Sequence, residues 1–223
     1  MQEVDSKVFT WDLEPTFASM GYGGVFNKKG GQVSEGLVCL FNKEKFRLVA
    51  SRSYIVAEEL PTNPLLSDVW SAVQRNELLA KRVLDRTTCL QLTVLETVDK
   101  SKRLVVANTH LYFHPDADHI RLLQVTTGLR LAHDWHRQNV NQMPETSLLF
   151  CGDFNSCPGY GIYELMTLQS IKEDYPAWAS SKQSHFFLFR KEPTTVNKSL
   201  IIHRALLLIA LPRFRTSCAR PVG

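Results

Sequence analysis

The stretch "LLFCGDFNSCPG", residues 148–159, passes from an apolar, strand-like run into an acid, an amide and then a turn. If the chain is still extended beyond Asp153, the side chains of Asp153 and Asn155 point to the same face, because side chains alternate along a strand. A carboxylate and an amide would then share one small volume at the end of a buried strand. This arrangement is typical of a metal or phosphate site.

Two other segments place polar residues beside strand ends: "QEVD", residues 2–5, and "ANTHLYFHP", residues 107–115. Functional groups tend to lie at such positions. Each segment alone is a weak signal, because Glu3 by itself is typical of a solvated carboxylate and His110 of a hydrogen-bonded structural histidine. Together the three segments favour one composite site.

The first part of the chain predicts a helix, a turn and two strands. Asp5 or Ser6 can cap a helix that runs toward Met20, and Pro15 is expected to bend it or end it early. The glycine-rich "GYGG", residues 21–24, predicts a turn. The apolar runs "GLVCLF" and "FRLVA", on either side of "NKEK", predict a hairpin.

The rest of the chain predicts alternating helices and strands. Apolar residues at helical spacing predict a helix within residues 65–86, and the runs at 89–98 and 104–110 predict two neighbouring strands. Asp118 is expected to cap the helix that follows. With the strand at 147–155, this order indicates an α/β fold of layered sheets covered by helices. Beyond about residue 180 the pattern loses its regularity.

Composition is that of an ordinary soluble domain. The chain has 223 residues, 44% hydrophobic and 22% charged, with a formal net charge of +4. A basic protein suits a polyanionic substrate. After Phe189, however, the sequence contains seven basic residues and only one acid, Glu192. The position of charge near the site therefore matters more than the net charge.

The cysteines and the apolar segments exclude several other classes. Five cysteines without paired spacing predict neither a disulfide framework nor a zinc module. The N-terminal "MQEVDSKVF" has no features of a targeting segment. The most apolar run, residues 199–214, is too short to span a bilayer. We therefore expect a reducing compartment, no membrane anchor and no obligate protein partner.

The motifs "QEV", "NTHL" and "GDFNS", in this order, resemble those of the endonuclease/exonuclease/phosphatase superfamily, which has the DNase I-like fold. The segment 110–124, with "HLYFHP" and "HIRLLQ", is similar to the branch of Ccr4-type poly(A) deadenylases, Angel proteins and 2′-5′ phosphodiesterases, and most of all to the last group. The resemblance implies a four-layer α/β/β/α sandwich with mixed sheets over residues 1–180, incomplete at both ends. Residues 181–223 are expected to form a divergent basic and apolar tail.

The same resemblance implies a role for each motif residue. Glu3 is expected to bind Mg²⁺, with Mn²⁺ as a possible substitute, and His110 to stabilise or protonate the phosphoryl transition state. Asp153 is expected to orient the attacking water and Asn155 to hold a phosphate oxygen. Asn108 is expected to border the substrate or support the site, and a plain strand-end hydrogen bond is the equal alternative.

Elementary chemistry agrees with these roles. A hard divalent cation held by few carboxylates and several waters neutralises charge at the phosphate oxygens. Histidine, with a pKa of about 6.5, can donate a proton near neutral pH, whereas an ionised aspartate cannot. Tyr112, Phe113 and Pro115 offer apolar surface on which an adenine would stack, at about 1–3 kcal/mol. Packing of Tyr112 and Phe113 against the next helix is the alternative.

The sequence thus predicts a magnesium-dependent phosphodiesterase or 3′-exoribonuclease that cleaves 2′-5′ oligoadenylates and poly(A) RNA. The resemblance implies the mitochondrial matrix, with the cytoplasm as the alternative. Another hypothesis is a non-catalytic or misfolded fragment, because motifs expected before Met1 and after residue 190 are missing. A DNA-repair endonuclease or a phosphoinositide phosphatase of the same fold is a third. All the enzymatic readings require His110 and Asp153 to lie within roughly 10 Å of each other, so that both reach one phosphate.

Overall fold

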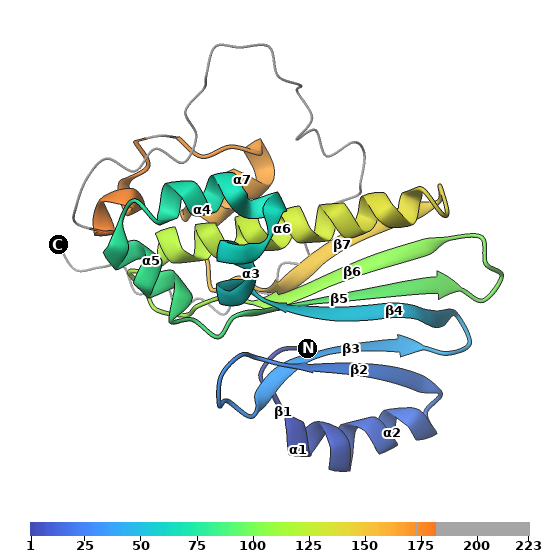
Figure 1. Cartoon of the computed structure of the whole chain (residues 1–223). Helices are drawn as coiled ribbons and strands as arrows, with labels where there is room; N and C mark the ends of the chain where they lie inside the picture. The colour runs from blue at the N-terminus through green and yellow to red at the C-terminus, as the bar shows by residue number, and fades with distance from the viewer. Residues whose placement is uncertain (173, 182–223) are drawn as a thin grey trace.

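The computed structural model describes residues 1–172 and 174–181. These residues form two β-sheets that lie one above the other (Figure 1). The first sheet has the strand order β1-β3-β2 and is antiparallel, and the second has the order β4-β5-β6-β7. In the second sheet β6 and β7 are parallel and the other neighbours are antiparallel. The strands are β1 (Val4–Asp5), β2 (Tyr22–Lys28), β3 (Glu35–Asn42), β4 (Phe46–Ile55), β5 (Cys89–Thr97), β6 (Arg103–His110) and β7 (Thr146–Asp153).

Helices cover the outer face of each sheet (Figure 1). The helical run from α1 to α2 lies below the three-stranded sheet, and the longest helix, α6, lies above the four-stranded sheet among the shorter helices. The helical elements are α1 (Ser6–Val8), the π-helical η1 (Phe9–Leu13), α2 (Glu14–Ser19), α3 (Val56–Thr62), η2 (Pro64–Leu66), α4 (Ser67–Val73), α5 (Glu77–Leu84), α6 (Asp118–Val140), α7 (Gly161–Leu168) and η3 (Pro176–Ser181). The α/β/β/α layering confirms the predicted fold class.

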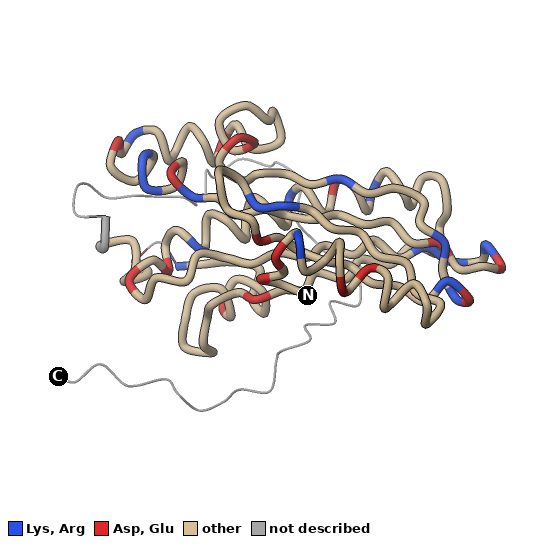
Figure 2. Tube along the Cα trace, turned by 90° about the horizontal axis from the view of Figure 1, so that it is seen from below, with Lys and Arg blue, Asp and Glu red and all other residues tan. Residues whose placement is uncertain are grey.

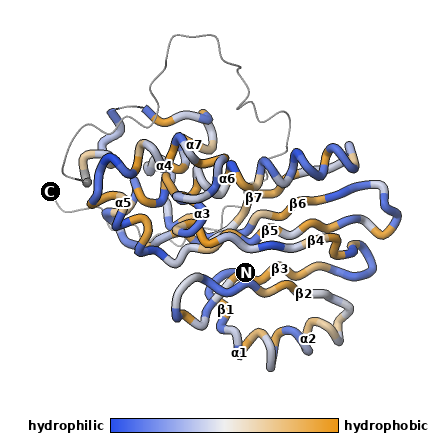
Figure 3. The backbone as a smooth tube through the Cα atoms, in the orientation of Figure 1, coloured by the Kyte–Doolittle hydropathy of each residue, from blue (hydrophilic) through white to orange (hydrophobic). Residues whose placement is uncertain are grey.

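Separate hydrophobic clusters fill the spaces between the layers. One cluster joins the four-stranded sheet to α6 and α7, another lies between the two sheets, and a third joins the three-stranded sheet to the N-terminal helices. Hydrophobic residues accordingly lie along much of β3, β5 and β6, and the C-terminal end of α6 is hydrophilic (Figure 3). Burial of apolar area between layers is the main force that holds such a sandwich together.

Strand β5 is buried on both faces. Leu90 and Leu92 contribute to the core beneath the helices, whereas Leu95, on the opposite face, belongs to the cluster between the sheets. The polar side chains of Gln91 and Thr93 are completely buried as well. The side chains on one face of this strand therefore pack beneath the helices, and those on the other face pack between the two sheets. Neither face of the strand is open to solvent.

One predicted turn and one predicted strand pairing are wrong. The turn at residues 21–24 is limited to Gly21, with φ of 82°, and β2 begins at the next residue. The predicted hairpin of residues 36–41 with 46–50 does not form, because β3 lies between β1 and β2 while β4 pairs with β5. The short link from Asn42 to Phe46 instead carries the chain from one sheet to the other.

Helix boundaries also differ in part from the predictions. Asp5 caps the first helix as expected by accepting a hydrogen bond from the Lys7 backbone N–H at 2.8 Å. Pro15 does not end that helix, which continues to Ser19, but the turn before it is π-helical. The helix expected within residues 65–86 is broken into three short elements, with Asn76 as the cap of α5.

The predicted capping role of Asp118 is wrong. Asp118 is already the first residue of α6, and Ala117 stands at the capping position. The Asp118 carboxylate instead accepts hydrogen bonds from the Gly161 backbone N–H at 3.1 Å and the Tyr175 hydroxyl at 2.5 Å. It therefore fastens the segments around α7 to α6. The tail expected beyond residue 180 lies almost entirely outside the described residues.

Candidate active site

The parallel pairing of β6 with β7 brings two of the predicted catalytic residues together. His110 and Asp153 are the last residues of their strands and lie opposite each other in the register. The His110 Nε2 atom is 4.0 Å from the Asp153 Oδ2 atom. His110 is 7% exposed, whereas half of the Asp153 side chain is exposed. An imidazole fixed in the protein thus lies beside a carboxylate that water can reach.

Asn155 joins this pair in a different way from the one expected. The extended chain predicted beyond Asp153 is wrong, because β7 ends there and Asn155 has a left-handed φ of 47°. Asparagine tolerates this region better than most residues. The Asn155 backbone N–H donates to Asp153 Oδ1, and its side-chain Nδ2 donates to the Leu111 carbonyl, both at 2.8 Å. The amide therefore ties the Asp153 turn to the residue after His110.

A lysine that the sequence analysis did not single out lies on the other side of the histidine. The Lys29 Nζ atom is 3.1 Å from His110 Nδ1 and 2.5 Å from Glu35 Oε1. The Lys29 side chain is 11% exposed. Both ring nitrogens of His110 thus face charged groups, with an ammonium at Nδ1 and the Asp153 carboxylate near Nε2.

These surroundings lower the pKa of His110 below its ordinary value. Burial of the ring is the largest cause, because it penalises the charged form, and the positive charge of Lys29 acts in the same direction. The negative charges of Asp153, Glu3 and Glu35 oppose the shift. His110 is therefore neutral at neutral pH.

Glu3 approaches the site from the N-terminal segment. It is exposed, it has a left-handed φ of 56°, and its charge acts on His110. Among residues 1–172 and 174–181, no three or more His, Cys, Asp or Glu side chains are grouped so that they could hold a metal ion. A cation here would have few protein ligands.

Asn108 is occupied by protein groups. It is 3% exposed and accepts a hydrogen bond from Gln2 Nε2 at 2.8 Å. Its own Nδ2 donates to Gln91 Oε1 at 3.2 Å and to the carbonyls of Met1 and Val38 at 3.3 and 3.4 Å. Asn108 therefore links the segment that carries Glu3 to the four-stranded sheet.

An open cleft of about 460 Å³ adjoins these residues. Its walls come from both sheets: the middle of β3, the ends of β6 and β7, and Met1 and Gln2. Asn108 and Asp153 lie in its lining. The cleft is large enough to accept part of a nucleotide, and Asp153 faces it.

The aromatic residues of the loop after His110 differ in their surroundings: one packs against the protein, and the other is open to a substrate base. Tyr112 is half-buried against a helical cluster, and the Arg86 guanidinium lies 4.4 Å from the centre of its ring. Phe113 is 71% exposed, and Pro115 is exposed too. The completely buried Arg121 donates to the Tyr112 and Pro115 carbonyls at 3.2 and 3.4 Å. Tyr112 packs against the protein, and Phe113 and Pro115 present free apolar surface.

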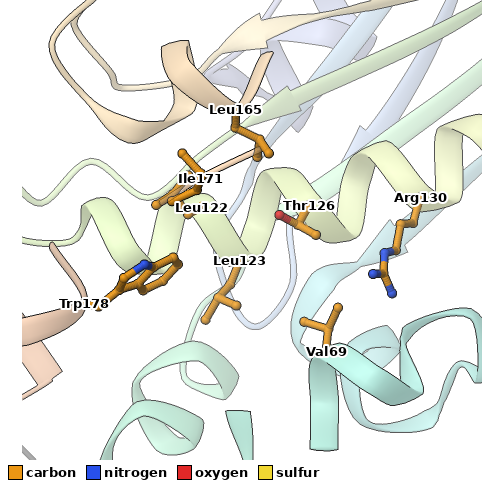
Figure 4. A pocket seen from close by; sticks show the side chains of 8 residues that line it. All are labelled: Val69, Leu122, Leu123, Thr126, Arg130, Leu165, Ile171 and Trp178. Carbon is orange, nitrogen blue, oxygen red and sulfur yellow. The ribbon is translucent and has the colours of Figure 1, made fainter. Parts of the chain in front are cut away.

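A second cavity lies between α4, α6 and α7 (Figure 4). Its lining is mainly apolar and includes Leu123, Ile171 and Trp178, with Arg130 at one side. Its volume is about 10 Å³. A space of this size holds one water molecule at most, so it is no ligand site.

Charge is distributed without a dominant sign around the described chain. Basic and acidic residues are interspersed along the trace (Figure 2). Near His110, by contrast, the charges have fixed places, with Lys29 next to Nδ1 and Asp153 near Nε2. No helix in the described part of the chain is both long and apolar enough to cross a membrane, and the apolar run at 199–214 lies outside that part.

Sequence analysis missed two residues beside the predicted site, Lys29 and Gln91. Lys29 follows directly after β2, and the incorrect turn predicted at residues 21–24 concealed this strand end. Gln91 lies inside β5 and is completely buried, although a polar residue that alternates with leucines is typical of a solvent-facing position. Correct assignment of β2 would have indicated Lys29 as a candidate site residue, because Lys29 lies beside the end of a strand as the other candidate residues do.

Comparison with known proteins supports the sequence resemblance. The chain is 39% identical over 184 residues to 2′,5′-phosphodiesterase 12 of Mus musculus, which covers 81% of this chain and 29% of that protein. It is 37% identical over 209 residues to the Homo sapiens protein of the same name, and this alignment covers 88% of this chain and 33% of that protein. The chain thus spans about a third of the length of these relatives. No family model matches the chain.

Solved structures share the fold. ANGEL2, described as a 2′,3′-cyclic phosphatase in complex with adenosine-2′,3′-vanadate, matches with a TM-score of 0.60 at 24% identity, over 82% of this chain and 47% of that chain. The human Nocturnin catalytic domain with a bound sulfate matches with a TM-score of 0.53 at 20% identity, over 82% and 60% of the two chains. The sequence similarity and the shared architecture lead to one conclusion: the chain belongs to the endonuclease/exonuclease/phosphatase superfamily.

Proposed function

We propose that this chain carries the catalytic groups of a phosphodiesterase that acts on RNA ends, with 2′-5′ oligoadenylates and poly(A) as substrates. The main support is the juxtaposition of His110 and Asp153 at the ends of two parallel strands, 4.0 Å apart. Because the two side chains lie side by side, a phosphate that contacts both rests against this edge of the sheet. The names of the relatives with 37–39% identity support the substrate class.

Each residue has a distinct task in this proposal. The Asp153 carboxylate is half exposed, so it can accept a hydrogen bond from the attacking water and orient it. His110 faces the phosphoryl oxygens with Nε2 and stabilises their developing charge. Asn155 donates one side-chain N–H to Leu111, and its second N–H contacts a phosphate oxygen. Asn108 holds the segment that carries Glu3 through its hydrogen bonds with Gln2 and Met1.

The donor set fits Mg²⁺ better than Zn²⁺. Glu3 would hold the ion, water and phosphate oxygens would complete its shell, and Mn²⁺ is an acceptable substitute. Zn²⁺ sites require several His or Cys ligands, and the described residues group none. When bound, the cation neutralises charge on the phosphate oxygens.

The exposed apolar residues favour a single-stranded end. Phe113 offers a ring on which an unpaired base stacks, and Pro115 offers a second apolar surface on the same loop. Tyr112 contributes indirectly, since its packing against Arg86 and the helices holds the loop. Location in the mitochondrial matrix stays a prediction of the sequence resemblance.

The first test is release of AMP from 2-5A and from poly(A) by the purified chain, with Mg²⁺ or with EDTA. We expect AMP from both substrates with Mg²⁺ and none with EDTA. Asp153→Ala is expected to lower the rate by at least about 100-fold, because the water loses its orienting group. Glu44→Ala removes an exposed carboxylate from the turn between β3 and β4 and is expected to leave the rate unchanged.

Absence of AMP release by the wild-type chain would contradict the proposal. So would a rate for Asp153→Ala equal to that of Glu44→Ala. If the wild-type chain binds oligoadenylate without cleaving it, a binding fragment becomes the better description.

A further inference from the structure

The side chain of Lys29 lies between Glu35 and His110. Its Nζ atom is 2.5 Å from Glu35 Oε1 and 3.1 Å from His110 Nδ1, and only 11% of the side chain is exposed. Lys29 and Glu35 face each other across the end of the β2–β3 pair, where the Lys29 backbone N–H also donates to the Glu35 carbonyl at 3.1 Å. The ammonium group is therefore held in place by both main chain and side chain.

This contact determines which ring nitrogen of His110 can carry a proton. An ammonium group has three donors and no acceptor, so the nitrogen it contacts must accept. A lysine amine is ordinarily more basic than imidazole by about 4 pKa units, so the shared proton stays on Lys29. The Glu35 carboxylate accepts a hydrogen bond from the same ammonium group at 2.5 Å. Nδ1 of His110 is then without a proton, and the neutral ring carries its proton on Nε2.

We propose that Lys29 is a positioning residue that holds His110 as the neutral Nε2–H tautomer, with this N–H directed to the side where Asp153 lies. The inference rests on the proposed function, because the group that would receive this hydrogen bond is the substrate phosphate. In this arrangement His110 stabilises the phosphate oxygens by donating a hydrogen bond, and it transfers no proton. Of the two roles expected for His110, stabilisation and protonation, the geometry points to the first.

The other charged groups around the ring are consistent with this tautomer. Asp153 on β7 lies 4.0 Å from Nε2, where a carboxylate favours an N–H. The negative charges of Glu3 and Glu35 act on the ring as well, but burial and Lys29 outweigh them and the pKa of His110 is lowered. The ring therefore remains neutral and has one donor, at Nε2.

The tautomer can be measured without any enzymatic activity. We would label the histidines of the whole chain with ¹⁵N, record long-range ¹H–¹⁵N spectra near pH 7, and identify His110 among the seven histidines by the signals lost in His110→Gln. Wild-type protein is expected to show a proton on Nε2 and none on Nδ1. A wild-type ring with its proton on Nδ1, or a doubly protonated ring, would overturn the inference.

Substitutions then test whether Lys29 is the cause. Lys29→Met removes the donor and is expected to populate the Nδ1–H tautomer, whereas Lys29→Arg keeps a donor-only group and is expected to keep the wild-type pattern. Lys28→Met is the matched control, because it removes an exposed lysine from the neighbouring position. An unchanged His110 pattern in Lys29→Met would overturn the inference.

Kinetics with 2-5A separate this role from direct substrate binding. Lys29→Met is expected to lower kcat by roughly 10- to 100-fold, as the loss of a residue that orients a functional side chain commonly does, with Lys29→Arg closer to wild type. A rise in KM alone, with the tautomer unchanged, would mean that Lys29 binds phosphate and would overturn the positioning role. A wild-type chain that releases no AMP contradicts the proposed function, and the spectra of the same chain still decide the tautomer.

Discussion

At the scale of single residues, Gly152 permits the close approach of His110 and Asp153. It lies in β7 with φ of 146°, a region that residues with a side chain rarely adopt. A Cβ atom at this position would lie 2.0 Å from the Thr109 carbonyl oxygen on the neighbouring strand. The glycine in the GDFN motif is thus required by the strand pairing that brings the two side chains together.

Gly152→Ala is therefore expected to destabilise the protein and displace Asp153. Backbone strain of this kind costs on the order of 1–3 kcal/mol, and the strands must also separate to relieve the clash. Urea denaturation followed by circular dichroism measures the loss. Gly159→Ala, where the added Cβ meets nothing within 4 Å, is the control and is expected to change the free energy of unfolding little. Equal stability of the two variants would contradict the packing described here.

The residue scale also shows what the sequence could and could not predict about the site. Glu3, His110, Asp153 and Asn155 were identified because short motifs carry them, and the structure brings the last three together around the ends of β6 and β7. Lys29 has no motif of its own. Its importance arises from a contact with a residue 81 positions away, and no local pattern records that contact.

At the scale of elements, a chain of buried amides connects the two sheets. Gln91 Nε2 on β5 donates to the Val25 carbonyl and to Asn27 Oδ1 on β2, both at 2.9 Å. Gln91 Oε1 accepts from Asn108, which in turn accepts from Gln2. Polar groups inside an apolar layer are costly unless they are paired. This network therefore favours one alignment of the sheets, in which the Glu3 segment lies next to β6.

Gln91→Leu is expected to lower the free energy of unfolding by about 1–3 kcal/mol, because the buried Asn108 and the half-buried Asn27 lose their hydrogen bonds to Gln91. Thr93→Val is a nearly isosteric change two residues along the same face of β5, and it is expected to cost less. Urea denaturation of both variants and of the wild type provides the comparison. A Gln91→Leu variant as stable as the wild type would show that the amide network contributes nothing to holding the sheets together.

Elements were predicted better than their pairing, for a physical reason. Apolar periodicity located the five strands from β3 to β7 and helix α6, since burial imposes that periodicity locally. The link between β3 and β4 is as short as a hairpin turn, yet the two strands pair with different partners. The choice depends on layers that form between distant segments. A strand such as β5, buried on both faces, likewise resembles a half-exposed strand when only its own residues are considered.

At the scale of the whole molecule, the sandwich encloses a histidine that makes its stability depend on pH. His119 on α6 is completely buried, and neither of its ring nitrogens has a hydrogen-bond partner within the described residues. Burial lowers its pKa to about 4, and the positive charges of Arg82 and Arg121 act in the same direction, against Asp118. The folded protein thus keeps this ring neutral well below the pH at which an unfolded chain protonates it.

Because the unfolded state binds this proton near pH 6.5 and the folded state only near pH 4, stability falls as the pH drops between these values and changes little above them. A shift of this size corresponds to a loss on the order of 3 kcal/mol. We expect His119→Leu to flatten the decrease between pH 6.5 and 4 in denaturation experiments, and His114→Gln, at an exposed histidine, to leave it as in the wild type. The carboxylates of the protein contribute to acid sensitivity in all three proteins, so the difference between the curves isolates His119. If the His119→Leu and wild-type curves stay parallel over this range, protonation of the buried ring does not limit the stability of the sandwich.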